Sequence, residues 1–150
     1  MLADPESVRY LGGHAFAREE AWRKMLASHA MWSLFGFGYW ALELRESGTY
    51  AGIAGFADYK RDMVPSIEGT AEAGWLVTPE AQGRGYASEA MLAALQWADE
   101  RLQVAEFTAI ISHGSEASIR VAEKLGFGGR EEALYHGEPI LLFRRKRRSA

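Results

Sequence analysis

One stretch of this chain, residues 71–97, constrains the fold more than any other, because it predicts a strand, a loop with glycines and a helix in direct succession. The apolar run over residues 73–77 is bounded by Pro79 and predicts a buried strand. Beyond the loop, apolar residues recur at helical spacing at positions 87, 90, 91, 94, 95 and 98. A glycine-rich loop that opens a helix presents free N–H groups at the positive end of the helix dipole. The expected ligand is therefore an anion, most simply a pyrophosphate.

Spacing narrows the choice of phosphate ligand. A P-loop requires Gly-Lys-Ser/Thr, and no lysine stands in this loop. A dinucleotide fingerprint places G-x-G-x-x-G/A directly after the strand, but residues 79–82 intervene. A tight turn that needs positive φ would account for Gly83 and Gly85 but not for Gln82. The pattern that remains is Q-x-x-G-x-A at Gln82, Gly85 and Ala87.

The segments before this stretch predict helices and then antiparallel strands. A short helix is expected over residues 5–11 and a longer one over residues 17–34. The longer helix carries a stripe that we expect to lie in the core, formed by Ala21, Trp22, Met25, Leu26, His29 and Trp32. Strands are expected over residues 39–46 and 50–58, with a polar loop over 60–69. Small residues at 51, 52 and 55 indicate a bulge or a close approach of substrate in the second strand.

The segments after the stretch complete a mixed α/β architecture. Residues 105–112 predict a strand parallel to the one at 73–77, joined to it by a right-handed crossover through the intervening helix. Ser115 can cap the next helix, and Gly126-Phe127 ends it. A last hairpin is expected from residues 129–135 and 140–144.

Length and composition suit a single domain over residues 1–143, followed by a basic tail over 144–150. The net charge is −3, and the run of arginine and lysine at 144–148 reads as a solvated, disordered end, with contact to nucleic acid or ribosome as the alternative. The chain has no cysteine, which excludes disulfides, thiolate metal sites and a covalent cysteine intermediate. No apolar run reaches the ~18 residues that a membrane span needs, so a cytoplasmic protein with no membrane partner is expected.

Two motifs carry a resemblance to a known family. The Q-x-x-G-x-A pattern, after a strand that ends in Val-Thr-Pro-Glu, resembles the acetyl-coenzyme A loop of the GCN5-related N-acetyltransferase (GNAT) superfamily, in particular the branch that includes ribosomal-protein N-terminal acetyltransferases. The segment from Ser115 to Phe127 ends in Lys-Leu-Gly-Phe and resembles the second signature of that family, in the expected order and separation. The resemblance covers roughly residues 39–144.

The resemblance implies a mixed, mostly antiparallel sheet, flanked by helices, whose central parallel strands at 74–78 and 105–112 splay apart. The pantetheine arm of acetyl-coenzyme A, the acyl donor, would lie in this wedge and bond to the strand backbone, with an N–H near Leu76 facing the thioester oxygen. The loop and the helix start would hold the pyrophosphate, and Arg84 would add charge at the rim. The residues expected to bind the cosubstrate are Trp75, Leu76, Val77, Gln82, Gly83, Arg84, Gly85, Tyr86, Ala87, Ser88 and Ser115.

Three departures from the family pattern stand out. Ser115 occupies the place of an asparagine that binds the pantetheine arm in many members, and Ala122 that of a tyrosine that acts as general acid. Family members usually begin with a strand and the first part of a helix ahead of a segment like Asp4-Pro5-Glu6, but here only three residues stand before it. Either the start codon is placed late, or the first strand of the family is absent. That absence would leave an open sheet edge beside residues 39–46, which a second subunit of a homodimer could cover.

The catalytic groups have several candidates. Glu72, at the start of the central strand, is the first choice for the base that takes the proton of the amine, with Glu43 next; a sheet-surface carboxylate is the alternative reading of Glu72. Ser118 is the first choice for a hydroxyl near the sulfur, with Tyr135 next; a helix-capping residue is the alternative reading of Ser118. The four histidines show no ligand spacing, so no metal is expected.

The resulting prediction is an N-acetyltransferase that passes an acetyl group directly to a primary amine. The acceptor is a protein N-terminus or a small amine such as an amino acid, polyamine or aminoglycoside, in a pocket built from residues 31–37, 59–68 and 135–138. The rival is a non-catalytic acyl-coenzyme A-binding or regulatory domain of the same fold. A nucleic-acid-binding module that uses the basic run is a third class of function, and nucleic acid is not an expected partner of the enzyme.

Overall fold

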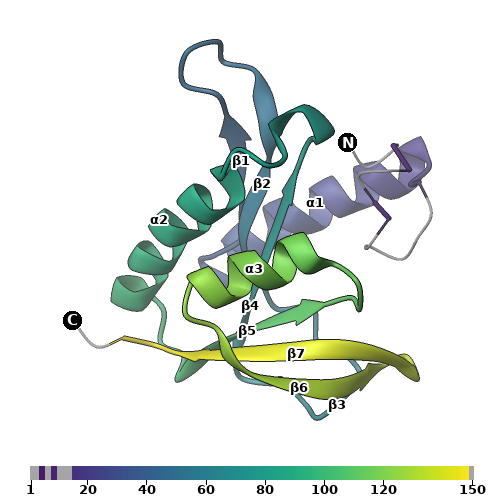
Figure 1. Ribbon diagram of the computed structural model, residues 1–150, viewed down its shortest axis with the longest axis vertical. Helices are drawn as coiled ribbons and strands as arrows, with labels where there is room; N and C mark the ends of the chain where they lie inside the picture. The colour runs from purple at the N-terminus through teal and green to yellow at the C-terminus, as the bar shows by residue number, and fades with distance from the viewer. Residues whose placement is uncertain (1–3, 6–7, 10–14, 149–150) are drawn as a thin grey trace.

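The computed structural model describes residues 4–5, 8–9 and 15–148, and in this part of the chain seven strands form one mixed sheet (Figure 1). The strands are β1 (Tyr39–Glu43), β2 (Tyr50–Ala57), β3 (Met63–Val64), β4 (Ala71–Val77), β5 (Glu106–Ile111), β6 (Gly128–Tyr135) and β7 (Glu138–Lys146). The helices are α1 (Arg18–Phe35), the single 3₁₀ turn η1 (Pro79–Ala81), α2 (Tyr86–Arg101) and α3 (Glu116–Lys124). The strand order is β1-β2-β4-β5-β7-β6-β3, and of these neighbours only β4 and β5 run parallel. The expected mixed, mostly antiparallel sheet with one central parallel pair is confirmed.

Helices α2 and α3 cover one face of the sheet, which we call the helical face (Figure 1). The predicted apolar stripe of α2 is buried there, through Met91, Ala94, Leu95 and Ala98. The opposite face, which we call the loop face, carries a smaller apolar cluster in which Met63 and Ile67, from the segment between β2 and β4, pack against Ala133 and Leu142. That segment was expected to be a plain polar loop, and the short strand β3 within it was missed.

The expectation that α1 lies in the core is wrong. Trp22, Met25 and Leu26 are 56%, 54% and 50% exposed, and Met31 is the one residue of α1 that is buried. Figure 1 shows that the N-terminal part of α1, drawn in purple, extends beyond the strands. Helical spacing identified an apolar face, but burial also requires a surface to cover it, and the described chain supplies one only near the C-terminal end of the helix. There Trp32 packs edge-on against Trp40 and Trp97.

Among the described residues, the edge of the sheet at β1 has no further strand beside it. Most of the helix expected over residues 5–11 lies outside the described residues. No strand precedes α1 in the ranges that the structure describes, and β1 pairs only with β2. The expected cover of this edge by a second subunit stays a prediction. None of the described helices is long and apolar enough to cross a membrane.

The small residues of β2 have a structural explanation. A Cβ at Gly52 would clash with the carbonyl of Leu76, and one at Gly55 with the carbonyl of Gly38. The close neighbours are therefore the backbones of the adjacent segments, not a substrate. The pairing of β1 with β2 also skips one residue, since Leu42 lies opposite Gly52 and Glu43 opposite Tyr50. The extra residue is Ala51, so the expected bulge is present on β2.

The basic run is not a solvated tail over its described length. Strand β7 continues through Lys146, past the expected domain end at residue 143. Arg144 bonds to Glu106 and Glu131. Arg145 is buried and donates two hydrogen bonds to Asp99 of α2, at 3.0 and 2.7 Å. The charges were read as solvated because their carboxylate partners are remote in sequence.

Candidate functional site

The parallel strands β4 and β5 diverge after a short paired region. They pair only at Ala71 with Phe107 and at Glu72 with Thr108. Strand β4 then runs on to Val77, still paired with β2 on its other side. The edge of β4 that faces β5 is thus without a strand partner beyond Glu72, and its peptide groups are available to an extended ligand. The expected wedge between the two strands is present.

The loop after β4 leaves a set of backbone amides free. The amides of Ala81 and Gln82 donate to Thr78 and Pro79, at 2.9 and 3.2 Å, and the next amide along the chain that has a protein acceptor is that of Glu89, which donates to Gly85 at 3.0 Å. Across residues 83–88, all of them described, no amide donates to a protein group. Gly85 is the N-cap of α2, and no side chain caps this helix end. Free amides at the start of a helix of this length form an anion site.

Two glycines give the loop its shape. Gly83 and Gly85 have φ values of 70° and 82°, in the left-handed region that glycine adopts without strain. Both are exposed, and a Cβ at either position would meet nothing within 4 Å. The requirement for glycine here is therefore one of backbone conformation and not of space.

The residues expected to bind the cosubstrate gather at one edge of the sheet, where β4 and β5 end. Residues 82–88 surround the start of α2, with the Arg84 guanidinium 5.0 Å from the Tyr86 ring, and residues 75–77 are half-buried on the open part of β4. Ser115 is buried at the N-cap of α3, but its side chain makes no capping hydrogen bond. Its hydroxyl is thus not committed to the helix that it begins.

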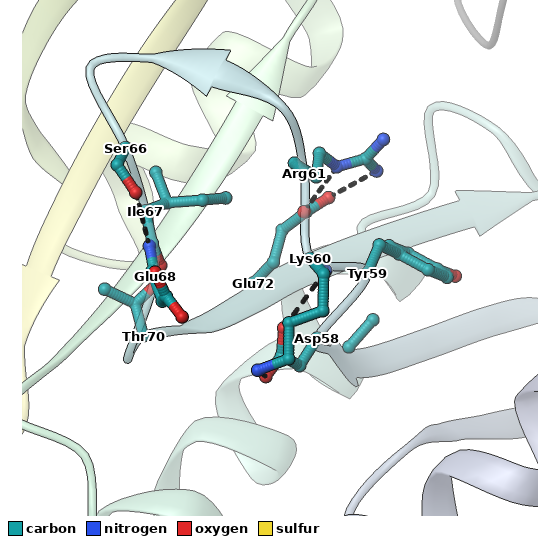
Figure 2. Close-up of a pocket in the computed structure, with 10 residues that line it drawn as sticks. Asp58, Tyr59, Lys60, Arg61, Ser66, Ile67, Glu68, Thr70 and Glu72 are labelled. Atoms are coloured by element: carbon teal, nitrogen blue, oxygen red, sulfur yellow. Dashed lines mark hydrogen bonds and ion pairs between the residues drawn. The ribbon is translucent and has the colours of Figure 1, made fainter.

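Glu72 lies on the loop face as one half of a buried ion pair. The side chain is 7% exposed, and its two oxygens accept hydrogen bonds from Nε and Nη2 of Arg61 at 2.6 and 2.7 Å (Figure 2). The Arg61 guanidinium also lies 4.9 Å from the ring centre of Tyr59 and 4.8 Å from that of Tyr135. Burial alone would lower the pKa of Arg61, but the hydrogen bonds and charge of Glu72 outweigh it and raise that pKa above its ordinary value.

A polar pocket of about 120 Å³ lies beside this pair, under the segment between β2 and β4 (Figure 2). Within it, Lys60 bonds to Asp58 at 2.7 Å, and the hydroxyl of Thr70 meets that of Thr108 at 2.9 Å. Its lining residues are Ala57, Asp58, Tyr59, Lys60, Arg61, Ser66, Ile67, Glu68, Thr70 and Glu72. Residues 59–68 were expected to help form the acceptor pocket, and the structure places this pocket at the closed end of the wedge.

Of the other catalytic candidates, Glu43 and Ser118 are not brought together with Glu72, whereas Tyr135 lies against Arg61, the partner of Glu72. Glu43 is exposed at the far end of β1, opposite Tyr50. Ser118 is half-buried in the first turn of α3, on the helical face. Ala122, at the position of the family tyrosine, is fully buried in the core. Tyr135 packs its ring on Arg61.

Sequence reasoning missed Tyr39 as a member of the site. The ring of Tyr39 rests on Gly74, so closely that a Cβ at that glycine would clash with the Tyr39 hydroxyl. Burial, then the hydroxyl of Tyr59 and the charge of Glu72, raise the pKa of Tyr39 well above its ordinary value. The sequence feature that could have identified Tyr39 is its place opposite two glycines, Gly55 and Gly74, in one row across three strands. That row can be recognised only once the register of the strands is known.

Within the described ranges, no group of three or more His, Cys, Asp or Glu side chains is arranged to hold a metal ion. The absence of a metal from the reaction stays a prediction.

Comparison with known proteins agrees with this architecture. Residues 1–128 match the family model of the acetyltransferase (GNAT) domain. YkkB, a protein of Bacillus subtilis (strain 168), is 30% identical over 112 residues; the match takes in 75% of this chain but only 63% of YkkB. A GNAT-family acetyltransferase from Bordetella pertussis superposes with a TM-score of 0.82 at 32% identity, covering 94% of this chain and 84% of that one. An acetyltransferase from Agrobacterium tumefaciens gives 0.80 at 28% identity, covering 96% and 80%.

Proposed function

The chain belongs to the GNAT acetyltransferase family, and on that premise we propose that it is an acetyl-coenzyme A-dependent N-acetyltransferase that acts on a primary amine. The observation that carries the proposal is the set of free amides at residues 83–88, at the start of α2. A diphosphate is the ligand that such amides suit best, because it accepts several hydrogen bonds and carries the charge that the helix dipole favours. Arg84, exposed at the rim, adds a positive charge.

The open edge of β4 supports the placement of the rest of the coenzyme. A pantetheine arm carries amide groups, so it can pair with the unpartnered peptide groups between residues 73 and 77 in the manner of an added strand. The thioester would then lie near Leu76, where a backbone N–H can stabilise the negative charge that develops on its oxygen. Ser115 and Ser118, at the start of α3, offer hydroxyls to the arm and to the sulfur.

The acetyl group passes directly from the thioester to the amine in this proposal. The chain has no cysteine to form an acyl-enzyme through a thiolate. Since α2 and α3 cover the helical face, the acceptor amine reaches the wedge from the loop face, beside the polar pocket. A protein N-terminus and a small amine are both acceptors of the required chemistry.

Glu72 as the base stays a prediction. Both of its oxygens accept hydrogen bonds from Arg61, so a proton that arrives at Glu72 competes with a charge-assisted bond. Its fixed position at the closed end of the wedge nevertheless places a carboxylate on the side from which the amine approaches.

Calorimetric titration with acetyl-coenzyme A, followed by a thiol-release assay over a panel of primary amines and N-terminal peptides, tests the proposed function. We expect saturable binding and amine-dependent release of coenzyme A. Tight binding with no thiol release for any amine would favour the non-catalytic acyl-coenzyme A-binding domain. No binding at all would contradict both functions.

A further inference from the structure

The position of Tyr39 follows from two glycines on neighbouring strands. Tyr39 begins β1 and lies in one cross-strand row with Gly55 of β2 and Gly74 of β4. Because neither glycine has a side chain, the Tyr39 ring crosses β2 and reaches β4. A Cβ at Gly74 would lie 3.1 Å from both Cε1 and Cζ of Tyr39 and would clash with its hydroxyl. The hydroxyl of Tyr39 therefore rests directly on β4.

This contact lies where β4 and β5 begin to diverge, near the closed end of the wedge. Gly74 is two residues beyond Glu72, the last residue of β4 that pairs with β5. Alternation along the strand puts Glu72 and Gly74 on the loop face, since Ala71, Ala73 and Trp75 pack into the core on the helical face. Tyr39 thus presents a hydroxyl on the side from which the amine approaches, whereas Ser118 lies on the helical face.

A second hydroxyl connects Tyr39 with the solvent. Tyr59 lies beside Tyr39 at the Arg61–Glu72 pair, with the centre of its ring 4.9 Å from the Arg61 guanidinium, and it is 44% exposed. The charged groups that face this pair are Glu72 of β4 and Arg61 of the segment after β2, and they neutralise each other through their two hydrogen bonds. The raised pKa of Tyr39 keeps its phenol neutral near pH 7, so it has a proton to pass on.

We propose that Tyr39 and Tyr59 form a two-hydroxyl relay that carries the proton of the acceptor amine from the wedge to the solvent. The amine nitrogen bonds to the acetyl carbon, the C–S bond of the thioester breaks, and coenzyme A leaves as a thiolate that is protonated by solvent. As the C–N bond forms, an N–H bond of the amine breaks and Oη of Tyr39 takes that proton. The O–H proton of Tyr39 passes to Oη of Tyr59, and that of Tyr59 passes to a solvent water, so both phenols end neutral. The relay rests on the proposed function and gives it a proton route that leaves the Arg61–Glu72 pair closed.

Tyr39→Phe tests the relay because it keeps the ring on Gly74 and removes only the hydroxyl. We expect kcat/KM for ethylamine to fall at least ~10-fold, in the lower range for a lost acid–base group, while the Kd for acetyl-coenzyme A changes less than about two-fold. The loss should be smaller for trifluoroethylamine, whose nitrogen surrenders its proton to bulk water more readily. A purely structural role of the hydroxyl would reduce turnover of both amines alike. The control is Tyr50→Phe, which removes the hydroxyl of an exposed tyrosine on β2.

Tyr59→Phe gives a second test should Tyr39→Phe fail to fold, because Tyr59 is partly exposed. It should show the same dependence on amine basicity with a smaller loss, since water can replace an outer hydroxyl. Turnover within two-fold of the wild type in the Tyr39→Phe enzyme, or an equal loss for both amines, would overturn the relay alone. A wild-type protein that binds acetyl-coenzyme A but acetylates neither amine would contradict the relay and the proposed activity together.

Discussion

Two arginines of this protein make nearly the same ion pair on opposite faces of the sheet. Arg61 donates two hydrogen bonds to Glu72 on the loop face, and Arg145 donates two to Asp99 on the helical face. Both guanidinium groups lie near aromatic rings, Arg61 against two tyrosines and Arg145 at 5.6 Å from the Phe107 ring centre. The pairs differ in their surroundings, because only Arg61 borders the polar pocket. An arginine–carboxylate pair can therefore stabilise the fold alone, as Arg145 and Asp99 do, or stabilise the fold and also line a candidate site, as Arg61 and Glu72 do.

The largest expected effect is on stability. In Arg61→Gln, Glu72 is left as a buried charge without a cation, which costs about 3–5 kcal/mol of unfolding free energy. Arg145→Gln should cost less, because Asp99 retains the hydrogen bond from the Arg148 amide at 2.9 Å. Urea denaturation of the two variants measures the difference. A larger loss in Arg145→Gln would contradict this account of the two pairs.

The next largest effect is on catalysis, and it distinguishes the Arg61–Glu72 pair from the Arg145–Asp99 pair. Arg61→Lys keeps the charge but loses the planar two-bond geometry that holds Glu72 beside the wedge. We expect kcat/KM for the amine to fall about ten-fold, which is about 1.4 kcal/mol of transition-state stabilisation, with an unchanged Kd for acetyl-coenzyme A. Arg145→Lys, the matched variant on the helical face, should leave kcat/KM within two-fold. Equal losses in both variants would mean that Arg61 acts only through the fold.

The smallest effect is a pH dependence of the helical-face pair, Arg145 and Asp99. Burial would raise the pKa of Asp99, but the hydrogen bonds from Arg145 and Arg148 outweigh it and hold that pKa below its ordinary value of 3.8. A depressed pKa in the folded state contributes stability above the unfolded-state pKa, and this contribution is lost as the pH falls through the folded value. The difference in unfolding free energy between the wild type and Asp99→Asn should therefore be constant near pH 7 and shrink below about pH 4. A difference that stays constant down to pH 2 would show that the charge of Asp99 contributes nothing.

The sequence was most informative where the structure depends on local chemistry. The strand, loop and helix over residues 71–97 follow from apolar spacing and from glycines with positive φ, both of which are properties of a short segment. The last hairpin was found for the same reason, since His136 and Gly137 at its turn also have positive φ.

The features that the sequence did not predict depend on contacts between segments that are distant in the chain. Trp22 and Met25 have helical spacing, yet no described segment covers them. Asp99 lies 46 positions before Arg145, so nothing near the basic run revealed its partner. Glu72 was identified as a candidate, but its pairing with Arg61 and the reach of Tyr39 across Gly55 required the fold of the segment between β2 and β4 and the strand register.

The central claim is that the free amides at the start of α2 bind the diphosphate of acetyl-coenzyme A. Calorimetric titration of Gly85→Val against Gly48→Val tests it most directly, because both glycines have positive φ and open space around them. The two variants thus carry a similar backbone cost, and only Gly85→Val disturbs the amides. We expect the Kd for acetyl-coenzyme A to rise at least ~10-fold in Gly85→Val and to stay within two-fold of the wild type in Gly48→Val. Equal affinities in the two variants would contradict it.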